Sequence, residues 1–202
     1  MDKDLTKSVL KAKGIRTARW LNVSSVEEID YEAIEEMGYP VFIKPTNGGS
    51  SVATFKITKR EDVENAVLEG LKWDKEVMIE EFIKGDEITC PVFDNELFPV
   101  LAIKAKTDFY DYEQKYSANG AEHYAIDLEP KIYEEVKKMA LDTYKALKCS
   151  VYSRIDMIIT EDGTPYVLEV NTLPGMTATS LFPQSASEKG ISYPEFIDMI
   201  ID

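Results

Sequence analysis

The sequence lacks several features that would assign its class directly. Two cysteines and one histidine exclude a disulfide framework, a multi-histidine zinc site and a histidine-based nucleophilic triad within this chain. We expect the single histidine, His123, to lie on the surface or in a loop. Basic residues are outnumbered by acids, 23 to 37, and the formal net charge of −14 disfavours non-specific binding of nucleic acid, which needs basic patches.

Long apolar runs are also missing. No stretch of about 18 apolar residues, as a membrane-spanning helix requires, occurs in the sequence, and residues 1–10 lack the apolar core of a signal peptide. Cys90 and Cys149 lie in apolar segments, where we expect reduced core thiols of a cytoplasmic protein. What remains is a globular composition of 202 residues, 44% hydrophobic and 30% charged, which is long enough for one large domain or two small ones.

Hydrophobic periodicity predicts alternating helices and strands in the first part of the chain. Asp4 and Asp30 are expected to cap helices, and Gly14 and Gly38 to end them. The predicted helices span 4–13, 31–37 and 61–72, and the predicted strands span 41–45, 51–57 and 76–82.

The second part of the chain has more strand-like runs. Asp94-Asn95-Glu96 joins two of them in a predicted hairpin, and Pro130 opens a long helix. Residues 105–125 have no clean period, which is typical of a lid or binding loop. The predicted strands here span 87–93, 97–103, 151–159 and 165–171. We therefore predict an α+β fold of two lobes, residues 1–85 and 86–202, that share a cleft.

One predicted hairpin carries a group of polar side chains. Asp162-Gly163 between two strand-like runs predicts a two-residue turn with positive φ at both positions. That register places Asp156 opposite Glu169 and Arg154 opposite Asn171, all on one face. The other face would carry the apolar residues Ile155, Met157, Ile159, Tyr166, Leu168 and Val170.

Facing carboxylates repel unless they share a proton or a cation. Mg²⁺ and Mn²⁺ prefer a shell of oxygens, to which Asn171 would add a neutral one. Arg154 supplies a forked cation suited to an anionic oxygen or carboxylate. The alternative is that Arg154 merely neutralises Asp156 and Glu169 on a solvated sheet face, but four polar groups together favour a metal site.

A second group of residues suggests phosphate binding. The loop KPTNGGSSV follows a strand, and its glycines and serines would let backbone N–H groups approach phosphate oxygens, although a plain hairpin turn is equally consistent. Lys44 leaves the core at the end of that strand, where a phosphate could neutralise it; alternatively it is an edge lysine. Glu80, Glu81 and Glu87 could accept hydrogen bonds from ribose and adenine, or could form a solvated acidic rim.

Five segments then occur in an order that resembles one known family. They are KPTNGGSS (44–51), IEEFIKGDE (79–87), FYDYEQKY (109–116), SRID (153–156) and LEVNTLPGMT (168–177). Together they resemble the ATP-grasp module of the D-alanine–D-alanine ligases, over essentially the whole chain. The resemblance implies two α+β lobes with the nucleotide between two sheets.

The resemblance also implies an activity and a set of site residues. ATP would phosphorylate the carboxylate of one D-alanine, and the amine of a second would attack the acyl phosphate to give a dipeptide for peptidoglycan. Residues matching the family's ATP site are Lys3, Lys44, Ser50, Glu80, Glu81, Phe82, Ile83, Glu87, Phe109, Lys115 and Leu168. Asp156, Glu169 and Asn171 would hold two Mg²⁺ (or Mn²⁺) ions. The remaining assignments are Arg154 with the Gly175 N–H for the oxyanion, Ser180 and Leu181 for the second substrate, and Tyr116 with Ser50 for ordering the site.

Several expectations follow from the same resemblance. The family's N-terminal domain would lie outside this chain, the isolated chain would have little or no ligase activity, and the full-length parent would form a homodimer. Lys115-Tyr116 favours an amine acceptor over D-lactate, and D-serine remains an alternative to D-alanine. Ala53 stands where relatives commonly have glycine. The alternative interpretations are another ATP-grasp carboxylate–amine ligase and a non-catalytic nucleotide-binding partner module.

Overall fold

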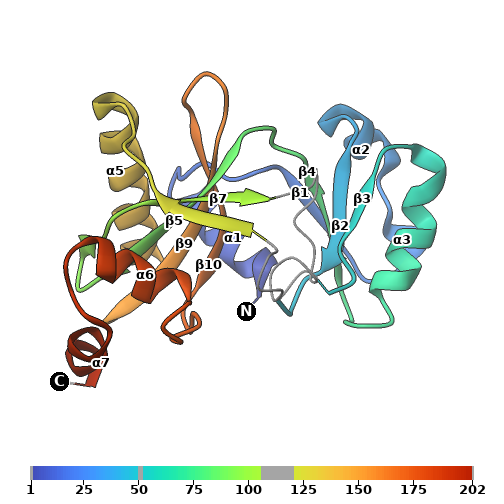
Figure 1. The fold of residues 1–202 in the computed structure, drawn as a ribbon. Helices are drawn as coiled ribbons and strands as arrows, with labels where there is room; N and C mark the ends of the chain where they lie inside the picture. The colour runs from blue at the N-terminus through green and yellow to red at the C-terminus, as the bar shows by residue number, and fades with distance from the viewer. Residues whose placement is uncertain (1, 50–51, 106–120, 202) are drawn as a thin grey trace. The chain divides into compact units, whose positions relative to one another are not determined.

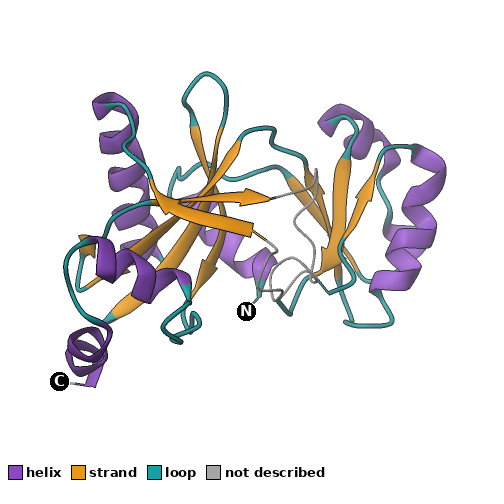
Figure 2. Ribbon diagram, in the orientation of Figure 1, coloured by secondary structure: helices purple, strands orange, loops and turns teal. Residues whose placement is uncertain are grey.

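The computed structural model describes residues 2–49, 52–105 and 121–201 (Figures 1 and 2). Contacts divide these residues into two units. Unit 1 comprises residues 2–8 and 18–83, and unit 2 comprises residues 9–17, 84–105 and 121–201. A division at residue 85 and a shared cleft stay predictions. The expected lid at 105–125 falls mostly outside the described residues, as do Ser50, Phe109, Lys115 and Tyr116.

Unit 1 is a four-stranded antiparallel sheet with helices packed on one face. The strand order is β1-β4-β2-β3, with β1 at Trp20–Val23, β4 at Val77–Glu81, β2 at Val41–Pro45 and β3 at Phe55–Ile57. Helices α2 (Tyr31–Met37) and α3 (Val63–Gly70) pack against it through a core that includes Ile34, Val67, Val41 and Ile43. Because side chains alternate along β2, Phe42 and Lys44 face away from this core.

The N-terminal caps of two helices can be compared with the predicted ones. Asp30 caps α2, as predicted, since its Oδ1 accepts a hydrogen bond from the Ala33 N–H at 3.0 Å. The prediction for the first helix, α1 (Lys3–Ala12), was wrong. Asp2, not Asp4, accepts from the Leu5 N–H at 2.8 Å, and Asp4 instead accepts from Trp20 Nε1 at 2.6 Å.

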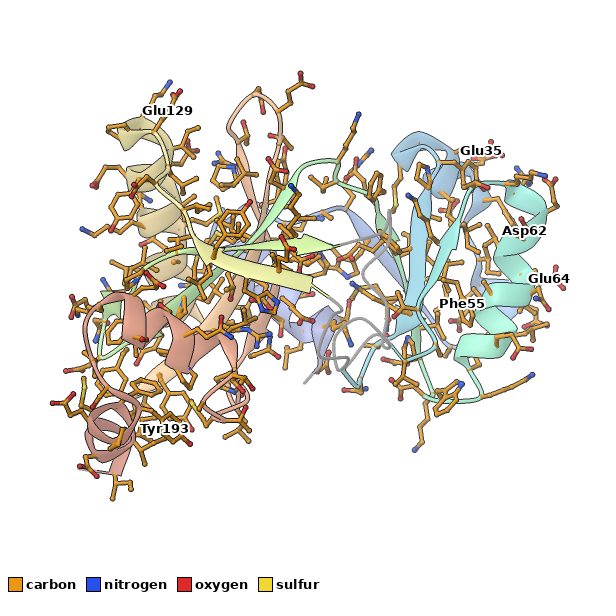
Figure 3. All side chains as sticks on the ribbon, viewed as in Figure 1. Glu35, Phe55, Asp62, Glu64, Glu129 and Tyr193 are labelled. Carbon is orange, nitrogen blue, oxygen red and sulfur yellow. The ribbon has the colours of Figure 1, made fainter. Side chains whose placement is uncertain are left out.

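Several acidic side chains of unit 1 lie on its outer surface. In Figure 3, Glu35, Asp62 and Glu64 lie around α2 and α3, and Glu64 points away from the strands of unit 1. Glu35 pairs there with Arg60, and about half of each side chain is exposed. Exposed pairs of this kind contribute little to stability.

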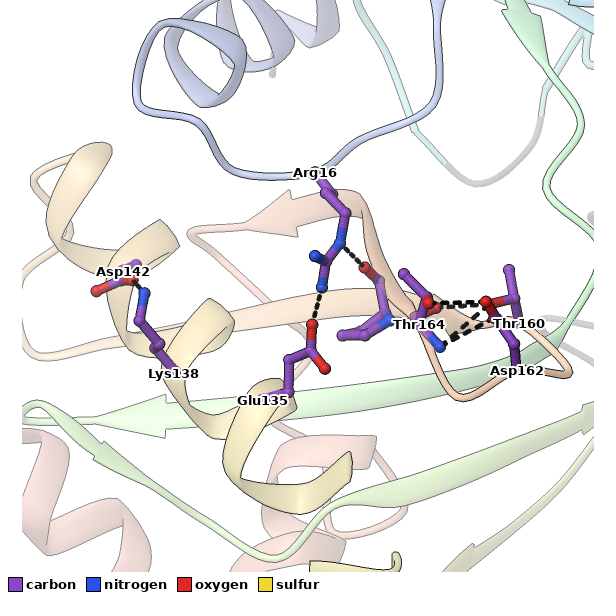
Figure 4. A network of polar contacts seen from close by, with 8 residues as sticks. Arg16, Glu135, Lys138, Asp142, Thr160, Asp162 and Thr164 are labelled. Carbon is purple, nitrogen blue, oxygen red and sulfur yellow. Dashed lines mark hydrogen bonds and ion pairs between the residues drawn. The ribbon is translucent and has the colours of Figure 1, made fainter. Parts of the chain in front are cut away.

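Unit 2 is a six-stranded antiparallel sheet of order β10-β9-β5-β7-β8, with β6 paired to β5. Its strands are β5 (Asp86–Phe93), β6 (Glu96–Leu97), β7 (Leu101–Ala105), β8 (Ala121–Ala125), β9 (Tyr152–Ile159) and β10 (Pro165–Asn171). Helix α5 (Pro130–Ala146) opens at Pro130, as predicted, and packs Val136 and Met139 into the core of this unit. Arg16 ties α5 to β10, because it pairs with Glu135 and donates to the Pro165 carbonyl (Figure 4).

Some details of unit 2 differ from the predictions. The run 97–103 is not one strand, because Phe98 leaves the sheet and packs with Phe182 and Phe196 of helices α6 (Leu181–Glu188) and α7 (Tyr193–Ile201). His123 lies half-buried on strand β8, not in a loop. Both cysteines are free thiols; Cys90 is buried in the core, as predicted, whereas Cys149 is only half-buried. Within the described part of the chain, no helix is long and apolar enough to cross a membrane.

The β9–β10 hairpin contains two departures from the predicted register that cancel. The turn spans three residues, Glu161–Gly163, because Thr160 and Thr164 pair through a backbone hydrogen bond of 3.0 Å. Gly163 has a φ of +83°, whereas Asp162 does not share the positive φ expected of a two-residue turn. The Asp162 carboxylate instead accepts hydrogen bonds from both threonines (Figure 4).

A β-bulge further along the hairpin restores the predicted pairing. Met157 faces Val167, one residue out of the expected register, and the register then shifts at Leu168. Beyond the bulge, Asp156 faces Glu169 and Arg154 faces Asn171, as predicted. Val167 therefore enters the core with Val170, and the prediction that placed Tyr166 and Leu168 there was wrong.

Candidate functional site

The polar face of unit 2 is built from three adjacent strands. Asp156 on β9 is 3% exposed. Arg154 donates two hydrogen bonds to the Asp156 carboxylate, from Nε to Oδ1 at 3.0 Å and from Nη2 to Oδ2 at 2.8 Å. The Thr89 hydroxyl on β5 donates to Asp156 Oδ1 at 2.6 Å. The strands thus hold this carboxylate in one orientation before any ligand arrives.

Asn171 joins the two acids of this face. Its Nδ2 donates to Asp156 Oδ2 at 3.1 Å and to Glu169 Oε1 at 3.2 Å. The two carboxylates therefore lie close enough to share one amide, on the same sheet face, as the sequence predicts. Glu87 on β5 also acts on this face, because its charge reaches Arg154.

Arg154 is mostly buried within this acidic face. Burial alone would lower the pKa of its guanidinium, but Asp156 in contact with it, together with Glu169 and Glu87, raises that pKa above its ordinary value. Burial lowers the pKa of His123, and the charge of Arg154 lowers it further. The face therefore combines a fixed cation with an imidazole whose charged form is disfavoured.

The donor set of this face fits a divalent ion that also binds a ligand. Among the described residues, no cluster of three or more histidine, cysteine, aspartate or glutamate side chains could hold a metal alone. Asp156, Glu169 and the Asn171 oxygen offer two charged ligands and one neutral one. An ion placed there would take the rest of its shell from water or phosphate oxygens, which is how Mg²⁺ is commonly bound.

Unit 1 contains a buried carboxylate between two lysines. Glu80 on β4 is 1% exposed. Its Oε2 lies 2.5 Å from Lys44 Nζ on β2, and its Oε1 lies 2.7 Å from Lys7 Nζ on α1. Lys44 is therefore not an edge lysine, and Glu80 is not part of a solvated rim.

The ion pairs and the burial of this cluster shift the pKa values of Glu80 and Lys7. Burial alone would raise the pKa of Glu80, but Lys44 and Lys7 outweigh that effect and lower the pKa to about 2. Burial also lowers the pKa of Lys7 from its ordinary value, although Glu80 opposes this shift. At neutral pH, Glu80 is thus an anion between two lysine side chains.

The structure also describes four other residues of unit 1 that were predicted to contact ATP. Lys3 donates to the carbonyls of Pro45 and Gly48 at 3.1 and 3.0 Å, so it braces the glycine-rich loop. Both oxygens of Glu81 bind Arg19, at 2.8 and 3.0 Å. Phe82 contacts the Phe42 ring edge-on, with centroids 5.7 Å apart, and Ile83 is half-buried.

The remaining predicted residues lie in unit 2. Leu168 is the extra residue of the bulge and is half-buried. Gly175 lies beside Ser180, since a Cβ at position 175 would approach Ser180 Oγ to 2.9 Å. The Ser180 hydroxyl accepts from the Thr177 N–H at 3.1 Å, and Leu181 begins α6. Gly175 and Ser180 therefore shape the loop that follows β10.

Two residues of these sites were not predicted from the sequence. Thr89 sits in an apolar strand pattern, and Lys7 belongs to the apolar stripe of its helix, three residues before Leu10. A lysine at a core position of an amphipathic helix is the signal that marks Lys7, because such a residue needs a buried partner.

Comparison with solved structures identifies the class. The chain matches the D-alanine–D-alanine ligase from Bacillus anthracis complexed with ATP with a TM-score of 0.87 at 38% identity, over 99% of this chain and 64% of that one. It matches the VanG D-Ala:D-Ser ligase from Enterococcus faecalis with a TM-score of 0.85 at 32% identity, over 100% of this chain and 60% of that one. The two-sheet α+β fold is therefore that of the ATP-grasp ligases.

Comparison of sequences identifies the family. The family described as "D-ala D-ala ligase C-terminus" matches residues 9–202. The D-alanine–D-alanine ligase B of Clostridium perfringens (strain 13) is 69% identical over 202 residues, which are 100% of this chain and 67% of that protein. The chain therefore belongs to the D-alanine–D-alanine ligase family of ATP-dependent ligases. It spans about two thirds of the length of this curated relative and slightly less of the solved chains.

Proposed function

We propose that this chain is the ATP-grasp part of a D-alanine–D-alanine ligase that serves peptidoglycan synthesis. In this reaction ATP phosphorylates the carboxylate of a first D-alanine, and the amine of a second displaces phosphate to form the dipeptide. The observation that carries the proposal is the polar face of β9 and β10, where Asn171 bridges Asp156 and Glu169 beside Arg154. Identity of 69% to a named ligase supports it.

Asp156, Glu169 and Asn171 are proposed to hold two Mg²⁺ or Mn²⁺ ions against the ATP phosphates. When bound, the ions would neutralise phosphate charge during phosphoryl transfer. Arg154 keeps the Asp156 carboxylate oriented. With the Gly175 N–H, Arg154 is also proposed to stabilise the oxyanion that develops when the amine attacks the acyl carbon.

Several further residues are proposed to contact the nucleotide. Lys44 would bind a phosphate, and Lys3 would hold the glycine-rich loop in place through its carbonyl contacts. Since both oxygens of Glu81 are engaged by Arg19, we assign position 81 a backbone contact. The other proposed contacts are Ser50, Glu80, Phe82, Ile83, Glu87, Phe109, Lys115 and Leu168.

The acceptor site is proposed to use Ser180 and Leu181 for the carboxylate of the second substrate, with Ser50 and Tyr116 ordering the site. D-serine is the second candidate acceptor, because the fold also matches a D-Ala:D-Ser ligase. We further propose a cytoplasmic enzyme that works with the family's N-terminal domain and forms a homodimer. By itself, the 202-residue chain would bind Mg·ATP weakly and turn over little.

Product analysis tests the proposed reaction. The full-length protein that carries this sequence is supplied with ATP, Mg²⁺ and D-alanine, alone or with D-serine or D-lactate, and both the product and the released phosphate are measured. We expect D-alanyl-D-alanine with one phosphate per peptide bond. Preferential formation of the mixed D-Ala–D-Ser product would move the assignment to the second candidate, and an absence of D-alanine-dependent phosphate release would refute both.

A further inference from the structure

Lys7 has no role in the proposed reaction, yet it is one of the most buried charges of the described chain. It is 2% exposed on α1. Its Nζ lies 2.7 Å from Glu80 Oε1 and donates to the Ala18 carbonyl at 3.1 Å. The ammonium also lies over the Trp20 ring, 5.3 Å from the centroid. Burial of a lysine at such a site costs free energy, so the position calls for an explanation.

The two lysines on Glu80 differ in their surroundings. The Lys7 side chain is 3% exposed, whereas the Lys44 side chain is 15% exposed. Lys7 is held on several sides by protein groups. The ammonium of Lys44 is the one that can turn toward a ligand.

The net charge of the cluster is also informative. Two ammonium groups and one carboxylate leave one positive charge, which an anionic ligand can neutralise. If Lys44 alone balanced Glu80, its move to a phosphate would leave a buried carboxylate without a partner, and that state is strongly unfavourable. With Lys7 in place, Glu80 keeps a counter-charge whichever way Lys44 points.

We propose that Lys7 is a positioning residue that holds the charge of Glu80, and so makes the Lys44 ammonium available to an ATP phosphate. This inference rests on the proposed ATP site and adds a residue to it. Lys7 acts through Glu80 and contacts no substrate atom itself. Without Lys7, Lys44 would be retained by Glu80.

Nucleotide binding by variants tests this role. Lys7→Met removes the charge but keeps an unbranched side chain beside Trp20, and Lys72→Met, which removes an exposed lysine of the same unit, is the matched control. Isothermal titration calorimetry of the full-length protein that carries this sequence, with Mg·ATP and with adenosine, gives the two affinities. We expect Lys7→Met to weaken Mg·ATP roughly ten- to a hundredfold, the range for a lost charged hydrogen bond, and to leave adenosine and the control unchanged.

A second pair of variants separates positioning from plain stabilisation. In a Glu80→Gln background no carboxylate retains Lys44, so adding Lys7→Met should not weaken Mg·ATP further. An equal loss in both backgrounds, or an equal loss for ATP and adenosine, would overturn the proposed role. If Lys7→Met does not fold, the comparison of Glu80→Gln with the double variant still decides, because neither contains the lone buried carboxylate. If the unaltered full-length protein binds no Mg·ATP, the proposed function itself fails.

Discussion

Asp156 and Glu169 face each other across strands β9 and β10, and the amide of Asn171 bridges them at 3.1 and 3.2 Å. This arrangement depends on a three-residue turn and a bulge that together return the hairpin to the required register. It places two carboxylates in adjacent positions without a cluster of further acids among the described residues. A cation that binds there needs phosphate or water oxygens, so we expect the nucleotide to strengthen metal binding.

The ion pairs of Glu80 predict a pH dependence of stability. The folded pKa of about 2 lies below the ordinary value of 4.5, so the stabilisation is complete above pH 4.5 and is lost as the pH falls toward 2. The difference corresponds to roughly 3 kcal/mol for this buried group. Urea unfolding between pH 7 and pH 2.5 should therefore show a smaller acid-induced loss for Glu80→Gln than for the control Glu64→Gln. Identical pH profiles would contradict the pairing.

Close contact at Gly85 predicts a steric effect of one methyl group. A Cβ at this position would lie 2.2 Å from the Ile159 carbonyl oxygen on β9, and backbone cannot yield as a side chain does. Gly85→Ala should lower the free energy of unfolding by about 1–3 kcal/mol. Gly49, which has nothing within 4 Å, is the control: Gly49→Ala should change urea unfolding little. Equal midpoints for the two variants would show that the strand end can shift.

The bulge at Leu168 predicts unequal costs for two neighbouring truncations. Val167 is 1% exposed in the core of unit 2, whereas Leu168 is only half-buried. Val167→Ala should destabilise the chain by about 1–2.5 kcal/mol, and the larger truncation Leu168→Ala should cost less. Chemical denaturation measures both. A larger loss for Leu168→Ala would favour the unbulged register, in which that residue belongs to the core.

Much of this fold follows from sequence pattern. The strands at 41–45 and 165–171 and the long helix from Pro130 agree with the predicted ones, because alternation and proline placement are local signals. The pairing of Asp156 with Glu169 was predicted correctly from an incorrect turn. The turn contains one residue more than predicted, Glu161, and the bulge leaves Leu168 without a cross-strand partner. The two one-residue errors in the predicted register therefore cancel. Nothing local in the sequence specifies a bulge, since its position depends on which side chains the core accepts.

Other features depend on contacts between distant residues. Asp4 is of a residue type that commonly caps helices, but its carboxylate accepts a hydrogen bond from Trp20. Asp2 caps the helix instead. The sequence indicated Lys44 and Glu80 separately. It did not indicate that they form an ion pair, or that Lys7 on a third element of unit 1 also pairs with Glu80. Charge partners across elements cannot be assigned from spacing along one chain.

Binding of Mn²⁺ to this chain with and without ATP, measured by isothermal titration calorimetry, tests the metal–phosphate site most directly. We expect metal binding that ATP strengthens. This strengthening should be lost in Glu169→Gln but not in Asp162→Asn, which alters an exposed acid of the same hairpin. Metal binding that is indifferent to ATP, or equal in the two variants, would contradict the assignment of Asp156, Glu169 and Asn171 to the metal–phosphate site.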